Sequence, residues 1–270
     1  MSIEPQPLSD PAVSSADATS HPAVDAIAQV KPAPVAPWWH TLLLVALILA
    51  NSFLGSSKVQ AVGSAGHGSR LLLYGGTFIT QSVLILILWL GIRSRRVRMR
   101  DLIGGEWKTV EAFLLDFGIA ALFWFFSLLL LFGLRVAFGL IDIHNLAKSQ
   151  QETLKLLAPL APHNYLEAAF WVALSVSAGL FEEIIFRGYL QRQFQSWFSN
   201  ATLAIIVAGI VFGLAHGYQG WRWMIVIAIF GMFFGILAHF RKSLRPGMMA
   251  HAFQDSLAGI ALFFLVRKHG

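Results

Sequence analysis

Long apolar runs alternate with short polar breaks from Trp38 to the end of the chain. A helix needs about 20 apolar residues to cross the hydrocarbon core of a bilayer. Seven runs approach this length: 38–55, 71–92, 112–140, 165–187, 202–216, 221–240 and 246–266. Neither strand alternation nor an internal repeat is visible. The pattern predicts an all-α, polytopic transmembrane helical bundle of about seven spans, or eight because the long third run contains Arg135.

The segment 1–37 differs in composition from the rest. Seven of the ten prolines lie in it, mixed with Ala, Ser, Asp and Val. Such a segment buries too little apolar surface to offset its ordering entropy. It also lacks the basic start and early apolar run of a signal peptide. We therefore expect a disordered tail over 1–37 and an integral membrane helical domain over 38–270.

The composition supports a membrane protein. Hydrophobic residues make up 56% of the chain and charged residues only 13%, whereas a soluble domain has roughly 25% charged residues. A soluble enzyme, a nucleic-acid-binding domain and a disordered scaffold are therefore disfavoured. The net charge of +6 is typical of the cytoplasmic flanks of membrane helices. Cysteine is absent, which excludes disulfide and thiol chemistry.

The basic residues predict an orientation. The densest cluster follows the second apolar run and contains Arg93, Arg95, Arg96, Arg98, Arg100 and Lys108. The positive-inside rule places this break in the cytoplasm. The N-terminus, Arg192 and the cluster Arg241/Lys242/Arg245 then lie on the same side. We expect a multi-pass protein of the plasma or inner membrane with a cytoplasmic N-terminus.

Carboxylates within apolar runs locate the candidate chemistry. After Glu167 only Glu182, Glu183 and Asp255 remain. A charge at the bilayer centre costs about 2.5–3.5 kcal/mol, so such residues usually face a bundle interior or a wet cavity. Glu183 and Arg187 are four apart and share a helical face, which leaves Glu182 free for proton transfer. The alternative is a Glu–Arg pair that simply ends a helix.

Two histidine motifs follow on later helices. His216 closes the fifth run, four residues after Phe212, and His251 lies four residues before Asp255. An acid on the same helical face can orient an imidazole or act with it toward one substrate oxygen. The alternatives are a satisfied polar residue at a span end for His216 and a helix-packing hydrogen bond for His251.

The polar stretch 187–202 connects the first two motifs. We expect it to form a helical hairpin that protrudes into the cytoplasm and turns near Ser199. Such a hairpin places Glu182 and His216 at similar depth, about 25 Å along their helices from the turn. The third motif joins them only if the hairpin extends well beyond the membrane surface.

Together the three motifs resemble the CPBP family, which includes type II CAAX prenyl endopeptidases and bacteriocin-processing or Abi-type membrane proteases. The family pattern is Glu-Glu-x-x-x-Arg, then Phe-x-x-x-His, then His-x-x-x-Asn/Asp. The matching residues are Glu182, Glu183, Arg187, Phe212, His216, His251 and Asp255. The resemblance covers about 165–260, the expected protease core. The third motif ends in Asp255, where prenyl-protein-processing members typically have Asn.

The resemblance implies an intramembrane endopeptidase with Glu182, Glu183, His216, His251 and Asp255 as catalytic residues. Glu182, assisted by His216, would activate a water, and His251 and Asp255 would lie on the oxyanion side. Arg187 would hold Glu183, which orients its neighbour, and Phe212 would be structural. The expected substrate is a membrane-embedded or lipid-anchored protein or peptide.

A zinc-dependent mechanism is an alternative, since the family was long classed among metalloproteases. Glu182, His216 and His251 would then form a His₂Glu site with an open position for water. We expect no tightly bound metal, and no other cofactor is indicated. The His-Glu-x-x-His, Gly-x-Gly-Asp and Gly-x-Ser-Gly patterns of other intramembrane proteases are absent.

Two non-proteolytic functions compete with this interpretation. The first is a membrane scaffold or immunity protein of the same fold, and the second is a small transporter with glutamates along an ion path. A scaffold needs no water-activating base, and transporter folds often have paired halves, which this sequence lacks. The full set of motif positions therefore favours the enzyme.

Overall fold

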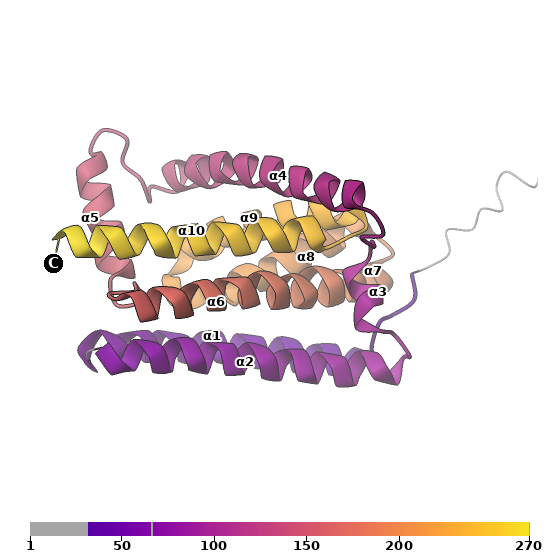
Figure 1. The fold of residues 1–270 in the computed structure, drawn as a ribbon. Helices are drawn as coiled ribbons and strands as arrows, with labels where there is room; N and C mark the ends of the chain where they lie inside the picture. Colours follow the sequence, from indigo (N-terminus) through magenta and orange to yellow (C-terminus); the bar gives the residue numbers. More distant parts are fainter. Residues whose placement is uncertain (1–31, 66, 270) are drawn as a thin grey trace, which may run out of the picture. The chain divides into compact units, whose positions relative to one another are not determined.

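The computed structural model describes residues 32–65 and 67–269 (Figure 1). The predicted tail over 1–37 falls largely outside the described residues. In chain order the helices are α1 Trp38–Ala65, α2 His67–Ser94, α3 Met99–Ile103, α4 Val110–Ala137, α5 Leu146–Leu157, α6 Tyr165–Glu182, η1 Glu183–Leu190, α7 Gln191–Phe198, α8 Ala201–Leu214, η2 Gly217–Gln219, α9 Trp221–Arg241 and α10 Arg245–His269. No strand occurs in the described part, which confirms the all-α prediction.

Six helical segments are long and apolar enough to cross a membrane. They are Trp38–Gly55, Arg70–Ser94, Val110–Ala137, Tyr165–Phe198, Trp221–Arg241 and Arg245–Lys268. The predicted fifth span is the shorter apolar helix α8. Its 14 residues extend about 21 Å, less than the roughly 30 Å of a hydrocarbon core. All seven predicted runs are thus helical, six of them at full spanning length, and the described residues contain no eighth span.

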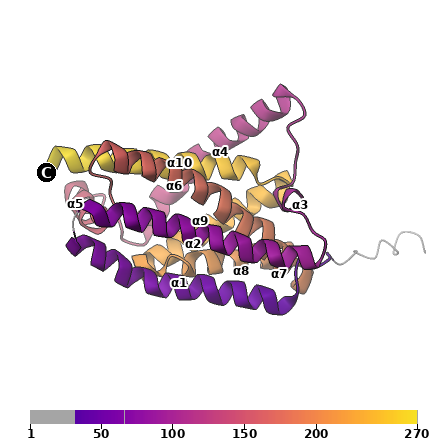
Figure 2. The same ribbon diagram turned by 60° about the horizontal axis from the view of Figure 1, so that its bottom comes forward.

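The long helices run side by side, and α5 lies across one end of the bundle (Figures 1 and 2). Helix α10 packs on α6 and α4, α6 packs on α2, and α2 packs on α1. Helix α8 contacts α9 and α7. The segment that carries the first motif therefore lies between α2 and α10.

The predicted hairpin between the first two motifs is present. Helix α6 continues through η1 into α7, which ends at Phe198. Ser199 adopts a left-handed conformation with φ 54°, and the Asn200 side chain accepts a hydrogen bond from Leu203 N at 2.9 Å to cap α8. The turn at Ser199 is confirmed.

A buried glutamine on this hairpin fixes the start of the described chain. Gln193 Oε1 accepts hydrogen bonds from Val35 N at 2.9 Å and Ala36 N at 3.2 Å. Gln193 Nε2 donates to Ala36 O at 2.9 Å. The three bonds satisfy backbone groups before α1 that no helix pairs. Residues 35–36 are thereby joined to α7.

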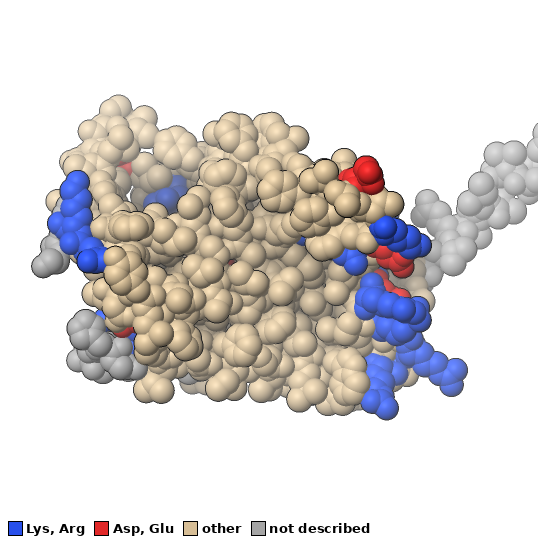
Figure 3. Space-filling view, in the orientation of Figure 1, with Lys and Arg blue, Asp and Glu red and all other residues tan. Residues whose placement is uncertain are grey.

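The basic clusters gather at one end of the bundle, where α3 lies (Figure 3). Leu244 N donates to Ile103 O at 2.8 Å, and Arg245 Nη1 donates to Gly104 O at 3.0 Å. These contacts join the break after α2 to the turn between α9 and α10. The two clusters that the positive-inside rule assigned to one side therefore share an end, and the cytoplasmic assignment of that end stays a prediction.

Close contact between α6 and α10 requires a glycine. A Cβ atom added at Gly179 would lie 2.6 Å from Ala252 N and 2.9 Å from its Cα. Backbone cannot yield as a flexible side chain does, so only glycine allows this approach. Further along, Trp171 Nε1 donates to the backbone oxygen of Asp255 at 3.0 Å. This contact sets the register of the motif residues on the two helices.

We predict that Gly179→Ala destabilises the protein by about 1–3 kcal/mol, because the added methyl group collides with backbone. Gly118→Ala is the matched control, since a Cβ atom there meets nothing within 4 Å. Alanine favours a helix interior by up to about 1 kcal/mol over glycine, so this variant should be neutral or more stable. Thermal unfolding in detergent measures both, and equal transitions would contradict the proposed packing.

Candidate functional site

The two glutamates lie where α6 passes into a π-helix. Segment η1 begins at Glu183, and Gln191 N donates to Phe186 O, an i to i+5 bond. Such π segments are rare and are frequent at functional sites. The wider turn separates Glu182, the last residue of α6, from Glu183, the first residue of η1.

Glu183 is the buried centre of the site. Its Oε1 atom lies 2.9 Å from Arg187 Nη1 and 3.1 Å from His251 Nδ1. Only 1% of the Glu183 side chain is exposed. The first and third motifs therefore meet at one carboxylate oxygen, and the predicted Glu183–Arg187 pair is present.

Arg187 is held from several sides. Its Nη2 atom donates to the backbone oxygen of Gly231 on α9 at 3.0 Å. Its guanidinium carbon lies 4.4 Å from the centroid of the Phe212 ring and 5.3 Å from that of Phe234. Cation–π contacts of this kind stabilise a desolvated guanidinium. Phe212 thus has an identifiable partner, and it joins the second motif to the first.

Glu182 has a different environment. Its Oε1 atom accepts from Gln81 Nε2 on α2 at 3.4 Å, and Gln81 Oε1 accepts from Ser177 Oγ at 3.1 Å. The side chain of Glu182 is 19% exposed. Adjacent carboxylates therefore differ sharply: one is buried and paired with a cation, and the other is partly accessible and has a neutral donor.

His251 connects both glutamates with Asp255. Its Nε2 atom lies 3.5 Å from Asp255 Oδ2 and 3.9 Å from Glu182 Oε2. Its Nδ1 atom faces Glu183. The imidazole is almost fully buried, while 39% of the Asp255 side chain is exposed. The cluster therefore runs from the buried Glu183 to an accessible edge at Asp255.

His216 lies at the end of α8 and joins the cluster through packing. Its Nδ1 atom lies 2.8 Å from Phe212 O, and its ring centroid is 4.8 Å from that of Phe212. The centroids of Phe212 and His251 are 6.4 Å apart. Within the described chain, no hydrogen bond or ion pair joins His216 directly to Glu182, His251 or Asp255.

The turn after His216 lies within electrostatic reach of the carboxylates Glu182 and Asp255. Tyr218 in η2 has its ring centroid 6.2 Å from that of His216. Desolvation of the hydroxyl group raises the pKa of Tyr218, and the carboxylates of Glu182 and Asp255 raise it further. The segment that carries the second motif is thus within electrostatic reach of the other two.

The residues of the zinc alternative do not form a metal centre. No group of three or more His, Cys, Asp or Glu side chains that could hold a metal ion occurs in the part of the chain that the structure describes. Glu182, His216 and His251 are therefore not brought together as a His₂Glu set among the described residues, and the ring of Phe212 lies next to both histidines. The metalloprotease assignment is not supported by this arrangement.

Three residues near the glutamates were missed in the sequence. Gln81 contacts Glu182 directly, and Ser177 donates to Gln81. The ring centroid of Phe234 lies 5.5 Å from that of His251. Gln81 carries a usable signal, because it is an amide in the apolar run 71–92. Ser177 and Phe234 carry none, since serine and phenylalanine are common in membrane helices.

The comparison with protein families agrees with this geometry. Residues 164–257 match the family described as type II CAAX prenyl endopeptidase Rce1-like. This match is consistent with a CPBP family intramembrane protease. All seven motif residues lie in the matched segment, whereas Gln81 lies outside it. No curated protein and no solved structure matches the chain.

We predict that Arg187→Met destabilises the protein by about 3–5 kcal/mol, because it leaves the buried Glu183 carboxylate without its cation. The double variant Glu183→Gln/Arg187→Met removes both charges and should recover much of the loss. Thermal unfolding in detergent compares the three proteins. A double variant less stable than Arg187→Met alone would show that charge pairing is not the cause.

Proposed function

We propose that the chain is an intramembrane endopeptidase that hydrolyses a peptide bond in a membrane-embedded or lipid-anchored protein or peptide. The observation that carries this proposal is the contrast between the two glutamates. Glu183 is neutralised by Arg187, and Glu182 beside it is partly exposed and has no cation of its own among the described residues, apart from the nearby His251. A scaffold has no need for a free carboxylate inside a membrane, where a charge is costly.

Glu182 and His216 are suited to activate the water. A backbone oxygen only accepts hydrogen bonds, so His216 Nδ1 donates to Phe212 O. In the neutral ring this leaves the lone pair on Nε2, which can accept a proton. The attacking water gives one proton to the Glu182 carboxylate while His216 Nε2 accepts a hydrogen bond from it, and the water oxygen bonds to the carbonyl carbon of the substrate. The same proton then passes to the amine nitrogen as the C–N bond breaks.

His251 is suited to stabilise the tetrahedral oxyanion. Its Nδ1–H donates to the Glu183 carboxylate, so in the protonated ring a second N–H on Nε2 faces the partly exposed side of the cluster and can donate to the developing negative charge. An ionised Asp255 only accepts hydrogen bonds, so it acts on His251 rather than on the oxyanion. We assign Asp255 as a positioning residue, together with Glu183, which contacts Nδ1 of the same ring.

The membrane environment fits this activity. The chain is an integral multi-pass membrane protein, and its cluster lies between long apolar helices. We place it in the plasma or inner membrane with the basic end in the cytoplasm. The substrate then approaches from the bilayer, and no nucleic acid is involved.

Glu182→Gln should reduce proteolysis about 100-fold or more, because the amide cannot accept the proton of the water. The control is Glu111→Gln, which makes the same change at an exposed carboxylate in the first turn of α4. Profiling of new protein N-termini in membranes compares both with the unchanged chain. Cleavage products that persist in Glu182→Gln, at equal protein level, would contradict the catalytic assignment and favour a scaffold.

Gln81→Met should lower kcat about tenfold and leave KM nearly unchanged, because a hydrogen bond to a charged group contributes about 1.5–3 kcal/mol. Ser82→Ala is the control, since the half-buried Ser82 donates only to Phe78 O on its own helix. A peptide spanning the identified cleavage site serves as substrate. A rise in KM alone would mean that Gln81 shapes the substrate path and does not position Glu182.

A further inference from the structure

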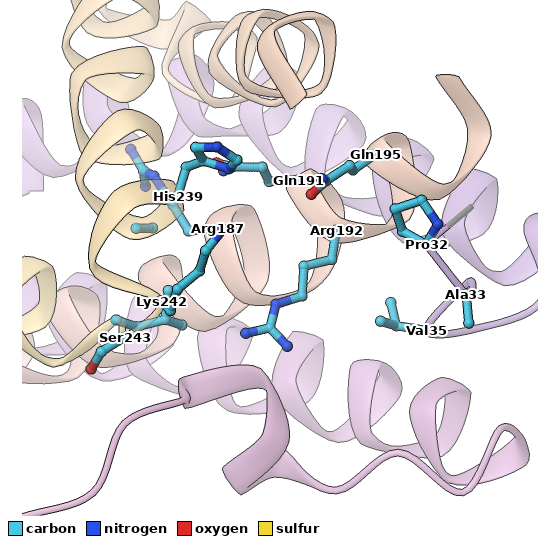
Figure 4. A pocket seen from close by; sticks show the side chains of 12 residues that line it. Pro32, Ala33, Val35, Arg187, Gln191, Arg192, Gln195, His239, Lys242 and Ser243 are labelled. Atoms are coloured by element: carbon cyan, nitrogen blue, oxygen red, sulfur yellow. The ribbon is translucent and has the colours of Figure 1, made fainter. Parts of the chain in front are cut away.

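A cavity lies at the basic end of the bundle (Figure 4), and Arg187 lies between it and the carboxylate cluster. It has a volume of about 250 Å³, enough for several waters at about 30 Å³ each. Its walls come from η1, α7, the turn between α9 and α10, and residues 32–35. The wall made by residues 32–35 is fixed in place, because Val35 N donates a hydrogen bond to Gln193 on α7.

Hydrogen-bond donors dominate the polar lining of this pocket. Four basic side chains surround it, and no Asp or Glu is among the lining residues. The basic side chains are Arg187, Arg192, His239 and Lys242, and two amides, Gln191 and Gln195, lie between them. A concave site with several cationic donors and no carboxylate selects an anion.

Arg187 is paired with Glu183, but the other basic groups of the pocket have no carboxylate partner of this kind among the described residues. In the described part of the chain, no carboxylate pairs with Lys242 or His239. Arg192 donates to the backbone oxygens of Asp101 and Leu102 at 2.6 and 3.1 Å. The Asp101 carboxylate itself is engaged by Arg98 through hydrogen bonds at 3.1 Å, which lower the pKa of Asp101. The Asp101 carboxylate is therefore already paired with Arg98.

The lining differs from an ordinary basic helix flank. Arg93, Arg95 and Arg96 are exposed and face outward in the same end region, as charges that only set orientation do. The pocket residues instead come from three separate segments and converge on one cavity. Bringing like charges together from distant segments costs free energy. The arrangement therefore indicates a ligand that compensates these charges.

We propose that this pocket binds a phosphate-bearing anion, supplied by the headgroup of an anionic phospholipid or by free phosphate. Guanidinium groups match phosphate geometry, and a lysine adds a point charge. Basic pockets between membrane helices at the cytoplasmic surface are suited to such headgroups. Because Arg187 both lines the pocket and pairs with Glu183, a bound anion shares its guanidinium with the carboxylate cluster.

The test measures binding and does not depend on proteolysis. The full-length protein is placed in nanodiscs of phosphatidylcholine, with and without phosphatidate, and separately in detergent with inorganic phosphate or chloride at equal ionic strength. Thermal unfolding reports binding, since a ligand that binds only the folded state stabilises it. We expect stabilisation by phosphatidate or by phosphate, and the arm that responds identifies the source.

Two substitutions decide whether the pocket is responsible. Lys242→Asn suits the left-handed conformation of residue 242, φ 54°, and should weaken binding about tenfold. Lys108→Asn makes the same change at an exposed residue outside the pocket and should retain the response. His239→Gln is a second pocket variant, in case Lys242→Asn folds poorly. A response that is absent in both arms, or reduced equally by Lys108→Asn and the pocket variants, overturns the proposal.

Discussion

A guanidinium buried among apolar helices places the strongest constraint on this structure. Arg187 is 3% exposed, and its charge is compensated by Glu183 at 2.9 Å, a backbone oxygen of α9 and the face of Phe212. An uncompensated charge at this depth would be very costly. The groups that compensate the Arg187 charge come from η1, α8 and α9, and Glu183 extends the contacts to α10. The helices that carry the three motifs are thus held together by one cation.

The same constraint distinguishes two chemically identical side chains. Glu183 is committed to Arg187 and His251, so it acts as a fixed negative charge in the interior. Glu182 is the last residue of α6, just before η1 begins, and it contacts a neutral amide from α2. A neutral donor orients a carboxylate without supplying a full opposing charge, which leaves it able to accept a proton. Position relative to one arginine therefore separates a buried, paired carboxylate from a partly accessible one.

The apolar pattern predicted the helical fold and the positions of the spans well, because a membrane requires long apolar helices and little else. Spacing of four residues predicted the Glu183–Arg187 contact and the His251–Asp255 contact, since i and i+4 share a helical face. The predicted turn at Ser199 also follows from local composition. These features depend on short stretches of chain, and each could be read from a single segment.

Contacts between distant segments could not be predicted in this way. Gln81 approaches Glu182 only because α2 packs on α6, and nothing in run 71–92 specifies that partner. The fifth run, 202–216, was counted as a span although it is short, and the corresponding helix α8 has only 14 residues. The pocket around Lys242 requires three segments of the chain, 32–35, 187–195 and 238–244, to converge. Its basic residues were correctly placed at one end, but as orientation signals alone.

The π-helix also restricts how this chain can change in length. Gln191 N bonds to Phe186 O five residues back, so one turn of η1 holds one residue more than an α-helical turn does. A further inserted residue that this turn did not absorb would rotate everything after it by about 100° relative to α6. Gln193 would leave Val35 and Ala36, and Arg192 would leave the carbonyl groups at the end of α3. A further insertion in η1 therefore alters several distant contacts at once.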